Sequence, residues 1–343
     1  YTTLLWWKTL FILKTIILNQ PHELKLTHRN DIAEKNNHAI VQIKRIGICG
    51  TDYHAFRGNQ PFFTYPRVLG HELGVQVVSI GQNNSASALN VGDRVAIEPY
   101  INCSQCQACL RGKYNCCENL NVIGVHSDGG MAEYLSVPLE KLHVSNKLNF
   151  EQLALVETLG IGLHAVNRSE IGPSTSVLII GAGPIGMSTA LFASQQGAKV
   201  LVADKSIERL DFILEHHLAS DILYIKDELN NNSVRKEYDG FLPEVIFDAT
   251  GNPTSMQNSF NLIAHGGRII WVGLVQGQVA FDDPNFHRRE ITLCASRNSL
   301  PSDFKNIINL MESGTIDITP WITHRTSLIE VPDSFKTFLN PNA

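Results

Sequence analysis

The sequence lacks an excess of positive charge, a long uninterrupted apolar run and any internal repeat. It carries 28 Lys and Arg against 33 Asp and Glu, a net charge of −5, so its charge does not favour nucleic acid or an anionic membrane as a partner. The apolar stretch at residues 4–18 is interrupted by Lys8 and Lys14 and is shorter than the ~20 residues that span a bilayer. No small-residue cleavage site follows it. We therefore predict neither a membrane anchor nor a nucleic-acid-binding protein.

A disulfide framework is also missing. The seven cysteines are odd in number and several recur at metal-ligand spacing, which predicts free thiols in a reducing cytoplasm. The length of 343 residues suits roughly two domains at ~150 residues each. The hydrophobic fraction of 43% and charged fraction of 18% exclude a disordered or fibrous protein. Because the chain begins with Tyr rather than Met, we expect residues 1–13 to be a non-native or disordered extension.

The pattern of apolar residues changes along the chain. Residues 14–150 contain short strand-like runs separated by turn residues, which predicts a β-rich domain with a metal-binding lobe inserted at about 100–120. A helical pattern covers 150–166. From residue 176 onward, apolar runs of strand length alternate with amphipathic segments, which predicts an α/β doubly wound parallel sheet. We interpret the polar stretch 228–233 as a solvated loop.

A glycine-rich motif lies between a predicted strand and a predicted helix, and it consists of Gly181, Ala182, Gly183, Pro184, Ile185 and Gly186. Its glycines allow a tight turn, close approach of the backbone to a pyrophosphate, and close packing of the helix. Asp204 ends the next strand, where a carboxylate can accept a hydrogen bond from the adenosine ribose and repel a 2′-phosphate. This favours NAD over NADP. Lys205 and Arg209 would soften that preference, or else are solvated charges at a helix start.

Four cysteines recur at close spacing in a polar segment: Cys103, Cys106, Cys109 and Cys117. Four thiolates close a tetrahedral site, so this pattern predicts a structural zinc. Cys116 lies beside Cys117, but the spacing favours Cys117. Cys294, in an apolar run, is expected to be a core residue.

A second, mixed set consists of Cys49 and the adjacent pair His71 and Glu72. One thiolate, one imidazole and one carboxylate suit a zinc that keeps a position open for water or substrate. Adjacent side chains of a regular strand point to opposite faces, so we expect a bend or a helix start at residues 71–72. Glu157 has apolar neighbours on a predicted helix, and zinc would supply the partner that a buried carboxylate needs.

These motifs together resemble the zinc-dependent medium-chain dehydrogenases. The resemblance runs from about residue 14 onward and is carried by C-G-T-D-x-H at 49–54, G-H-E at 70–72, G-D-R-V at 92–95, D-G-G at 128–130, E-Y at 133–134, the four-cysteine lobe and G-A-G-P-I-G at 181–186. The carboxylates Glu72 and Glu157 are similar to those of the sorbitol and threonine dehydrogenase branch. The segments 58–72, 121–130, 283–290 and 295–299 look like bacterial members that oxidise hexonates such as L-galactonate or L-gulonate at C5.

The resemblance implies a GroES-like catalytic domain over residues 14–156 and 296–343 and a Rossmann NAD-binding domain over 157–295. Cys49, His71 and Glu72 would hold a catalytic zinc, with Glu157 as an exchanging fourth ligand. Asp52 would orient His71, and Thr51 with His54 would pass the alcohol proton to solvent. The nicotinamide half of the cofactor would contact a further set of residues: Val272, Gly273, Leu274, Arg297 and Asn298. The resemblance also implies a homo-oligomer, dimer or tetramer.

A sugar-acid carboxylate needs a cationic or amide contact, for which the candidates are Asn59, Gln60, Arg67, His126 and Arg297. Two alternatives stay open: a polyol, threonine or simple alcohol dehydrogenase, and a catalytically inactive dinucleotide-binding zinc protein. Two features depart from the family pattern. Val75 stands where a glycine is usual and Gly74 one step earlier, so we expect a disturbed metal loop; and the chain ends at 340–343 before the family's final strand.

Overall fold

The structure is a computed structural model that describes residues 12–29, 32–82 and 89–339. The chain forms two compact units, one built from the residues up to Glu157 and from Leu300 onward, the other from Thr158–Ser299. Most of the expected N-terminal extension, residues 1–11, lies outside the described residues, and Leu13 already belongs to the first strand. Among the described residues, no helix is long and apolar enough to cross a membrane.

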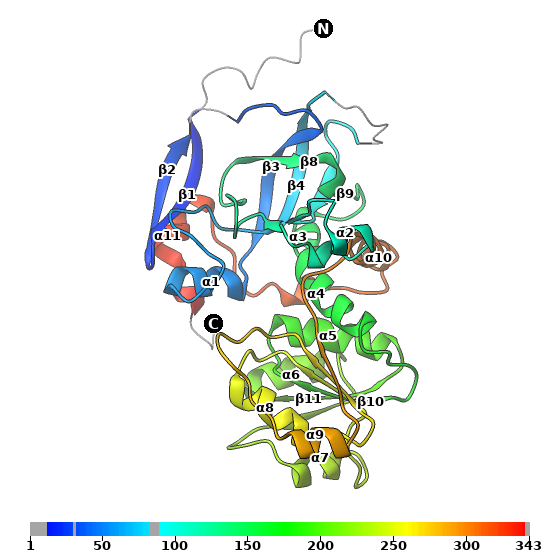
Figure 1. The fold of residues 1–343 in the computed structure, drawn as a ribbon. Helices are drawn as coiled ribbons and strands as arrows, with labels where there is room; N and C mark the ends of the chain where they lie inside the picture. Colours follow the sequence, from blue (N-terminus) through cyan, green and yellow to red (C-terminus); the bar gives the residue numbers. More distant parts are fainter. Residues whose placement is uncertain (1–11, 30–31, 83–88, 340–343) are drawn as a thin grey trace. The chain divides into compact units, whose positions relative to one another are not determined.

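The Thr158–Ser299 unit is a doubly wound parallel sheet, which confirms the predicted fold class (Figure 1). Its strand order is β12-β11-β10-β13-β14-β15, and every neighbouring pair is parallel. The order reverses between β10 and β13, the switch point at which such sheets bind ligands. The strands are β10 Ser176–Ile180, β11 Lys199–Asp204, β12 Asp221–Tyr224, β13 Val245–Asp248, β14 Arg268–Trp271 and β15 Thr292–Ala295.

Helices cover this sheet because its central strands are apolar on both faces. In β10, Val177 through Ile180 are all buried, as is most of β11. Helix α5 packs against β10 and β11, and α8 packs against β13 and β14. The helices of the unit are α4 Val156–Asn167, which begins in the other unit, α5 Pro184–Gln195, α6 Ile207–Glu215, α7 Asn231–Glu237, α8 Pro253–Leu262 and α9 Asp283–Arg288.

The other unit is built on a five-stranded antiparallel sheet in the order β8-β3-β4-β5-β9. Two strand pairs accompany it, β1-β2 and β6-β7. The strands are β1 Leu13–Gln20, β2 Glu23–Arg29, β3 His38–Gly47, β4 Glu72–Ile80, β5 Arg94–Ile97, β6 Tyr100–Ile101, β7 Asn121–Val122, β8 Tyr134–Pro138 and β9 Leu142–Val144. The helices are α1 Gly50–Arg57, α2 Gln107–Leu110, α3 Phe150–Ala154, α10 Pro301–Glu312 and α11 Val331–Ser334. Short 3-10 turns, such as Tyr114–Cys116, complete the unit.

The disturbance expected at Val75 is absent. Val75 is fully buried in the core of the sheet, and the close approach of backbones lies one residue earlier, at Gly74. A Cβ on Gly74 would lie 2.0 Å from the carbonyl oxygen of Phe150 in α3. Opposite this pair, β3 carries one extra residue, because Ile43 pairs with Val75 and Arg45 with Gly74. Gly74 therefore lies where α3 crosses β4, at the point where a side chain would not fit.

Two sequence expectations in the parallel-sheet unit are wrong. The stretch 228–233 is not all loop, because α7 begins at Asn231 and the side chain of Asn230 caps it by accepting from the backbone N–H groups of Asn232 and Ser233. Cys294 is half-buried rather than in the core, because β15 is an edge strand of the sheet.

Candidate metal and cofactor sites

The four-cysteine lobe begins with β6, which pairs with β7, and carries α2 and one 3-10 turn between them. The four predicted thiols are brought together, with their sulfurs all within 4.8 Å of one another: Cys103, Cys106, Cys109 and Cys117. The backbone N–H of Cys103 donates to Cys117 Sγ at 3.2 Å. Cys116 is exposed and outside this set. Four converging thiols form a closed, soft ligand set of the kind that suits structural zinc.

Backbone amides tune the thiols of the lobe. Amides of Gln105 and Cys106 point at the sulfur of Cys103 and lower its pKa to about 6. Amides of Glu118 and Cys109 likewise lower the pKa of Cys106. Desolvation and the neighbouring sulfurs of Cys106 and Cys117 instead raise the pKa of Cys109 to about 11. The set thus contains both stabilised thiolates and a thiol that a cation would have to deprotonate.

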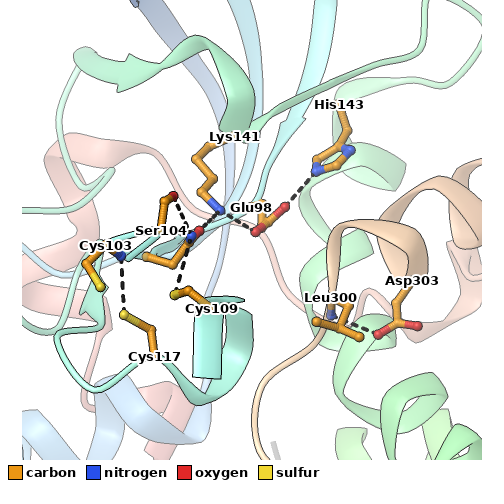
Figure 2. Close-up of polar contacts among 10 residues, drawn as sticks. Glu98, Cys103, Ser104, Cys109, Cys117, Lys141, His143, Leu300 and Asp303 are labelled. Carbon is orange, nitrogen blue, oxygen red and sulfur yellow. Dashed lines mark hydrogen bonds and ion pairs between the residues drawn. The ribbon is translucent and has the colours of Figure 1, made fainter. Parts of the chain in front are cut away.

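A buried polar cluster stands next to the lobe (Figure 2). Lys141 Nζ donates to Glu98 Oε1 at 2.7 Å and to Asn102 Oδ1 at 2.8 Å, and His143 Nε2 lies 3.0 Å from Glu98 Oε2. The side-chain amide of Asn102 donates to Ser104 Oγ at 3.1 Å. Because Glu98 and Lys141 are only 1% and 3% exposed, these contacts neutralise charges that water cannot reach. The cluster ties the root of the lobe to β5 and β9.

The mixed set converges at the other metal-type site. Ligand atoms of Cys49, His71 and Glu72 lie within 4.8 Å of one another. Cys49 is the N-cap of α1, and Glu72 opens β4, directly after Gly70 turns the chain at a φ of 95°. The chain therefore bends here and enters a strand rather than a helix. The bend lets both His71 and Glu72 point inward, with 5% and 4% of their surface exposed. A Cβ on Gly47 would lie 2.0 Å from Glu72 Oε2, so the missing side chain makes room for this carboxylate.

Asp52 joins the two segments that carry these ligands. Its Oδ2 accepts from the backbone N–H of Cys49 at 3.0 Å, and its Oδ1 accepts from that of Gly70 at 3.4 Å. The same Oδ1 lies 3.8 Å from His71 Nδ1, beyond hydrogen-bond distance. Asp52 therefore positions the backbone around both ligands and faces the imidazole as a charge.

The electrostatics of this set favour a cation. Desolvation, and then the charge of Glu72, raise the pKa of the Cys49 thiol. Burial lowers the pKa of His71, but the charges of Cys49 and Asp52 outweigh it and raise that pKa well above its usual value. His71 Nδ1 is buried with no hydrogen-bond partner among the described residues. Buried acidic groups around an unsatisfied imidazole nitrogen are the environment that a divalent ion relieves, so the residues fit a zinc ion.

Glu157 lies beside this set but not within it. Burial raises the pKa of its carboxyl, and the charge of the nearby His71 opposes that shift. Its Oε1 accepts a short hydrogen bond from the hydroxyl of Tyr100, a residue that sequence reasoning missed. The two residues are 57 positions apart, and no local pattern links them.

The predicted proton path begins next to Cys49. The backbone N–H of Thr51 donates to Cys49 Sγ at 3.5 Å, and Thr51 and His54 both lie in α1, one half-buried and one exposed. Their order from interior to surface is compatible with proton transfer outward.

The candidates for substrate contacts are spread over several segments. Arg67 lies 3.6 Å from Asp128 and donates to Thr64 Oγ1 at 2.9 Å. The Nδ1 of His126 accepts from the backbone N–H of Val122 at 2.9 Å. Asn59 and Arg297 are exposed, and Gln60 Oε1 is buried with no hydrogen-bond partner among the described residues. The guanidinium of Arg67 and the ring of His126 therefore already serve contacts within the fold.

The glycine motif has the geometry of a dinucleotide loop. It joins β10 to α5, with Gly181 at a φ of 102° and Gly183 as the N-cap of the helix. A Cβ on Gly186 would lie 1.8 Å from the carbonyl oxygen of Gly181, whereas one on Gly183 would meet open space. Pro184 and Ile185 form the first helical turn. An open backbone at a helix N-terminus fits a pyrophosphate.

Asp204 holds this loop to the next strand. Its Oδ2 accepts from the backbone N–H of Ala182 at 2.6 Å, and its Oδ1 accepts from that of Ser206 at 2.8 Å. Arg209 is exposed in the first turn of α6, and its backbone N–H donates to Ser206 Oγ at 3.3 Å. The carboxylate is thus fixed at the carboxyl end of β11, next to the glycine motif.

The residues expected around the nicotinamide follow β14 and β15. The backbone N–H groups of Val272 and Gly273 donate to the carbonyl of Asp248 at 2.9 and 3.0 Å, and Leu274 is exposed. Asn298 has a φ of 53°, and its Nδ2 is buried without a hydrogen-bond partner among the described residues. An unsatisfied donor in this unit fits a polar cofactor.

Family models match both units of the chain. Residues 35–147 match the alcohol dehydrogenase GroES-like domain and residues 184–313 match the zinc-binding dehydrogenase family. The chain belongs to the zinc-dependent alcohol dehydrogenases. Membership of this family makes it a zinc-binding oxidoreductase.

Individual relatives extend this family result over most of the chain. L-galactonate-5-dehydrogenase of Escherichia coli K12 is 42% identical over 94% of both chains. L-idonate 5-dehydrogenase of Vitis vinifera is 32% identical over 87% of this chain and 83% of its own. A crystal structure described as the short chain alcohol dehydrogenase rspB of E. coli CFT073, complexed with NADH, is 28% identical, with a TM-score of 0.89 over 96% of both chains.

Proposed function

We propose that this zinc-dependent dehydrogenase oxidises a secondary alcohol of a sugar acid to the ketone with NAD, the substrate being a hexonate such as L-gulonate or L-galactonate at C5. The convergence of Cys49, His71 and Glu72, with Glu157 next to them, carries the proposal, because these carboxylates resemble those of the sorbitol and threonine dehydrogenase branch. The similarity to L-galactonate-5-dehydrogenase and L-idonate 5-dehydrogenase supports the substrate class.

Each residue of the buried set has a distinct task in this proposal. Cys49, His71 and Glu72 hold the zinc, and a bound zinc lowers the pKa of an alcohol at its open position. Asp52 keeps the ligand-bearing segments in register. Thr51 accepts the alcohol proton and passes it to His54, whose exposed ring releases it to water.

The cofactor site lies on the glycine motif in this proposal. The backbone at Gly181, Gly183 and Gly186 receives the pyrophosphate, and Asp204 accepts from the ribose hydroxyls. A 2′-phosphate would meet the charge of Asp204. The test is Asp204→Ala, which should lower the ratio of kcat/KM for NAD to that for NADP about tenfold or more. An unchanged ratio would remove Asp204 from this role.

A substrate panel tests the proposed reaction. NADH formation is followed by absorbance with hexonates of different configuration, with the matching polyols that lack the carboxylate, and with threonine and simple alcohols. We expect the highest kcat/KM with a hexonate that carries the reacting hydroxyl at C5. Higher kcat/KM with a polyol or with threonine would replace the sugar-acid proposal by the corresponding dehydrogenase activity.

We also propose a homo-oligomer, dimer or tetramer, in a reducing compartment such as the cytoplasm. Seven free cysteines, four of them in one thiol set, support the reducing compartment. Light scattering coupled to size-exclusion chromatography gives the mass in solution, and a monomeric mass would contradict the oligomer.

A further inference from the structure

Tyr100 is the residue of the metal region that neither the ligand set nor the proton path uses. It lies in β6, is 3% exposed, and donates its hydroxyl proton to Glu157 Oε1. Glu157 is 5% exposed. A hydrogen bond from a neutral donor to a buried carboxylate is among the stronger ones in proteins, because water does not compete for it.

The hydrogen bond from Tyr100 ends on a buried carboxylate that lies outside the converging set. Cys49, His71 and Glu72 form that set, whereas Glu157 lies outside it, close enough for its charge to act on His71. A carboxylate free to move would approach the metal, since nothing attracts an anion in a buried site more strongly than a divalent cation. The hydroxyl of Tyr100 supplies a competing contact.

The backbone around Tyr100 is held on both sides, so the hydroxyl has a fixed position. Two residues before it, Glu98 is bound by Lys141 and His143, and its backbone N–H donates to the carbonyl of Lys141 at 2.9 Å. Two residues after it, the side-chain oxygen of Asn102 accepts a hydrogen bond from Lys141 Nζ at 2.8 Å. Tyr100 is thus carried by the first strand of the cysteine lobe, clamped by one lysine.

We propose that Tyr100 is a positioning residue that holds Glu157 back from Cys49, His71 and Glu72 and so keeps one coordination position of the catalytic zinc open to substrate. The inference rests on the proposed function. Glu157 exchanges with water and substrate because the hydroxyl of Tyr100 competes with the metal for its carboxylate.

The test uses the full chain with cobalt in the catalytic site, where a thiolate ligand gives a visible charge-transfer band. Imidazole titrated into this enzyme binds at an open position and shifts the spectrum. Tyr100→Phe removes only the hydroxyl. The matched control is Tyr114→Phe, the same change at a residue of the lobe that is 39% exposed.

We expect Tyr100→Phe to require about 10- to 100-fold more imidazole for the same spectral shift, because Glu157 then occupies the open position. The variant should also release the catalytic metal to a chelator more slowly than the parent enzyme, and Tyr114→Phe should behave as the parent. Equal or tighter imidazole binding in Tyr100→Phe, or faster metal release, would overturn the role of Tyr100. Absence of the thiolate band in the parent enzyme would instead overturn the zinc site of Cys49 and with it the proposed function.

Discussion

The two metal-type sites differ in how the chain builds them. The four thiols of the lobe come from one continuous segment of fifteen residues, Cys103 to Cys117, and two of them, Cys109 and Cys117, are buried. Cys49, His71 and Glu72 come from two separate segments, which Asp52 joins through hydrogen bonds. The side chains of His71 and Glu72 are almost fully buried. A local, uniform ligand set serves to fold a lobe, whereas a mixed, buried one keeps charged groups in an environment where they act strongly on a substrate.

The largest expected effect breaks the mixed set. Cys49→Ser should lower turnover by at least about a thousandfold, because the loss of a ligand removes the charge stabilisation that the metal supplies. NADH binding, measured by fluorescence titration, should be retained because the glycine motif belongs to the other unit. Cys294→Ser, at the edge strand β15, is the matched control with unchanged turnover. Normal turnover in Cys49→Ser would contradict the assignment.

Breaking the lobe should act on stability instead. Cys106→Ser should reduce the zinc content from two ions to one per chain and lower the free energy of unfolding by about 4 kcal/mol, as the loss of a structural metal does. Metal analysis and urea denaturation measure the two quantities. The control is Cys116→Ser, an exposed thiol outside the set. Two zinc ions in Cys106→Ser would show that Cys106 is not a ligand. One zinc ion in Cys116→Ser would show that Cys116 is a ligand of the lobe.

Lys141→Met tests the buried clamp at the root of the lobe. We expect the free energy of unfolding to fall by about 3 kcal/mol, because Glu98 is left buried with only His143 to compensate its charge. The reference change is Lys25→Met, whose ion pair with Glu23 is exposed and should contribute below about 1 kcal/mol. Equal losses in the two variants would mean that burial does not strengthen the pair.

The smallest effect is expected at Glu151, which joins α3 to the C-terminal segment. Hydrogen bonds from Arg325, and then Arg45, hold the pKa of Glu151 at about 2, against an ordinary value of 4.5. The contribution to stability is therefore fully present above about pH 4.5 and is lost as the pH falls toward about 2. Glu151→Gln should cost less than about 1 kcal/mol at neutral pH, because the group is solvated.

Denaturation of Glu151→Gln and the parent protein at neutral pH and at about pH 3 tests this sign. The difference in free energy of unfolding between the two proteins should shrink on acidification. A difference that grew instead would contradict the lowered pKa of Glu151.

Local patterns predict the fold and the lobe well. Apolar runs such as 176–181 form the parallel sheet because a strand covered on both faces has to be apolar throughout. The spacing of Cys103, Cys106, Cys109 and Cys117 predicts the convergence of their sulfurs, since thiols that recur every few residues in a turn-rich segment can surround one ion. Both are properties of continuous stretches of chain.

Contacts between distant residues were beyond such patterns. The hydrogen bond of Tyr100 to Glu157 joins β6 to α4, and the clamp of Lys141 on Glu98 joins a 3-10 turn to the segment after β5, both far apart along the chain. The start of α7 was missed for a different reason. Asn230 and its neighbours are typical of a loop, and only the capping hydrogen bonds distinguish the two.

Gly47 has a consequence that extends beyond packing. The carboxylate of Glu72 occupies the space where a side chain of residue 47 would begin. Even alanine would displace this ligand and remove one negative charge from the coordination sphere, leaving the metal more electrophilic and less firmly bound. The missing side chain of Gly47 thus helps to determine the net charge of the ligand set, and a redesign of this enzyme toward another metal can begin at a residue that binds no metal itself.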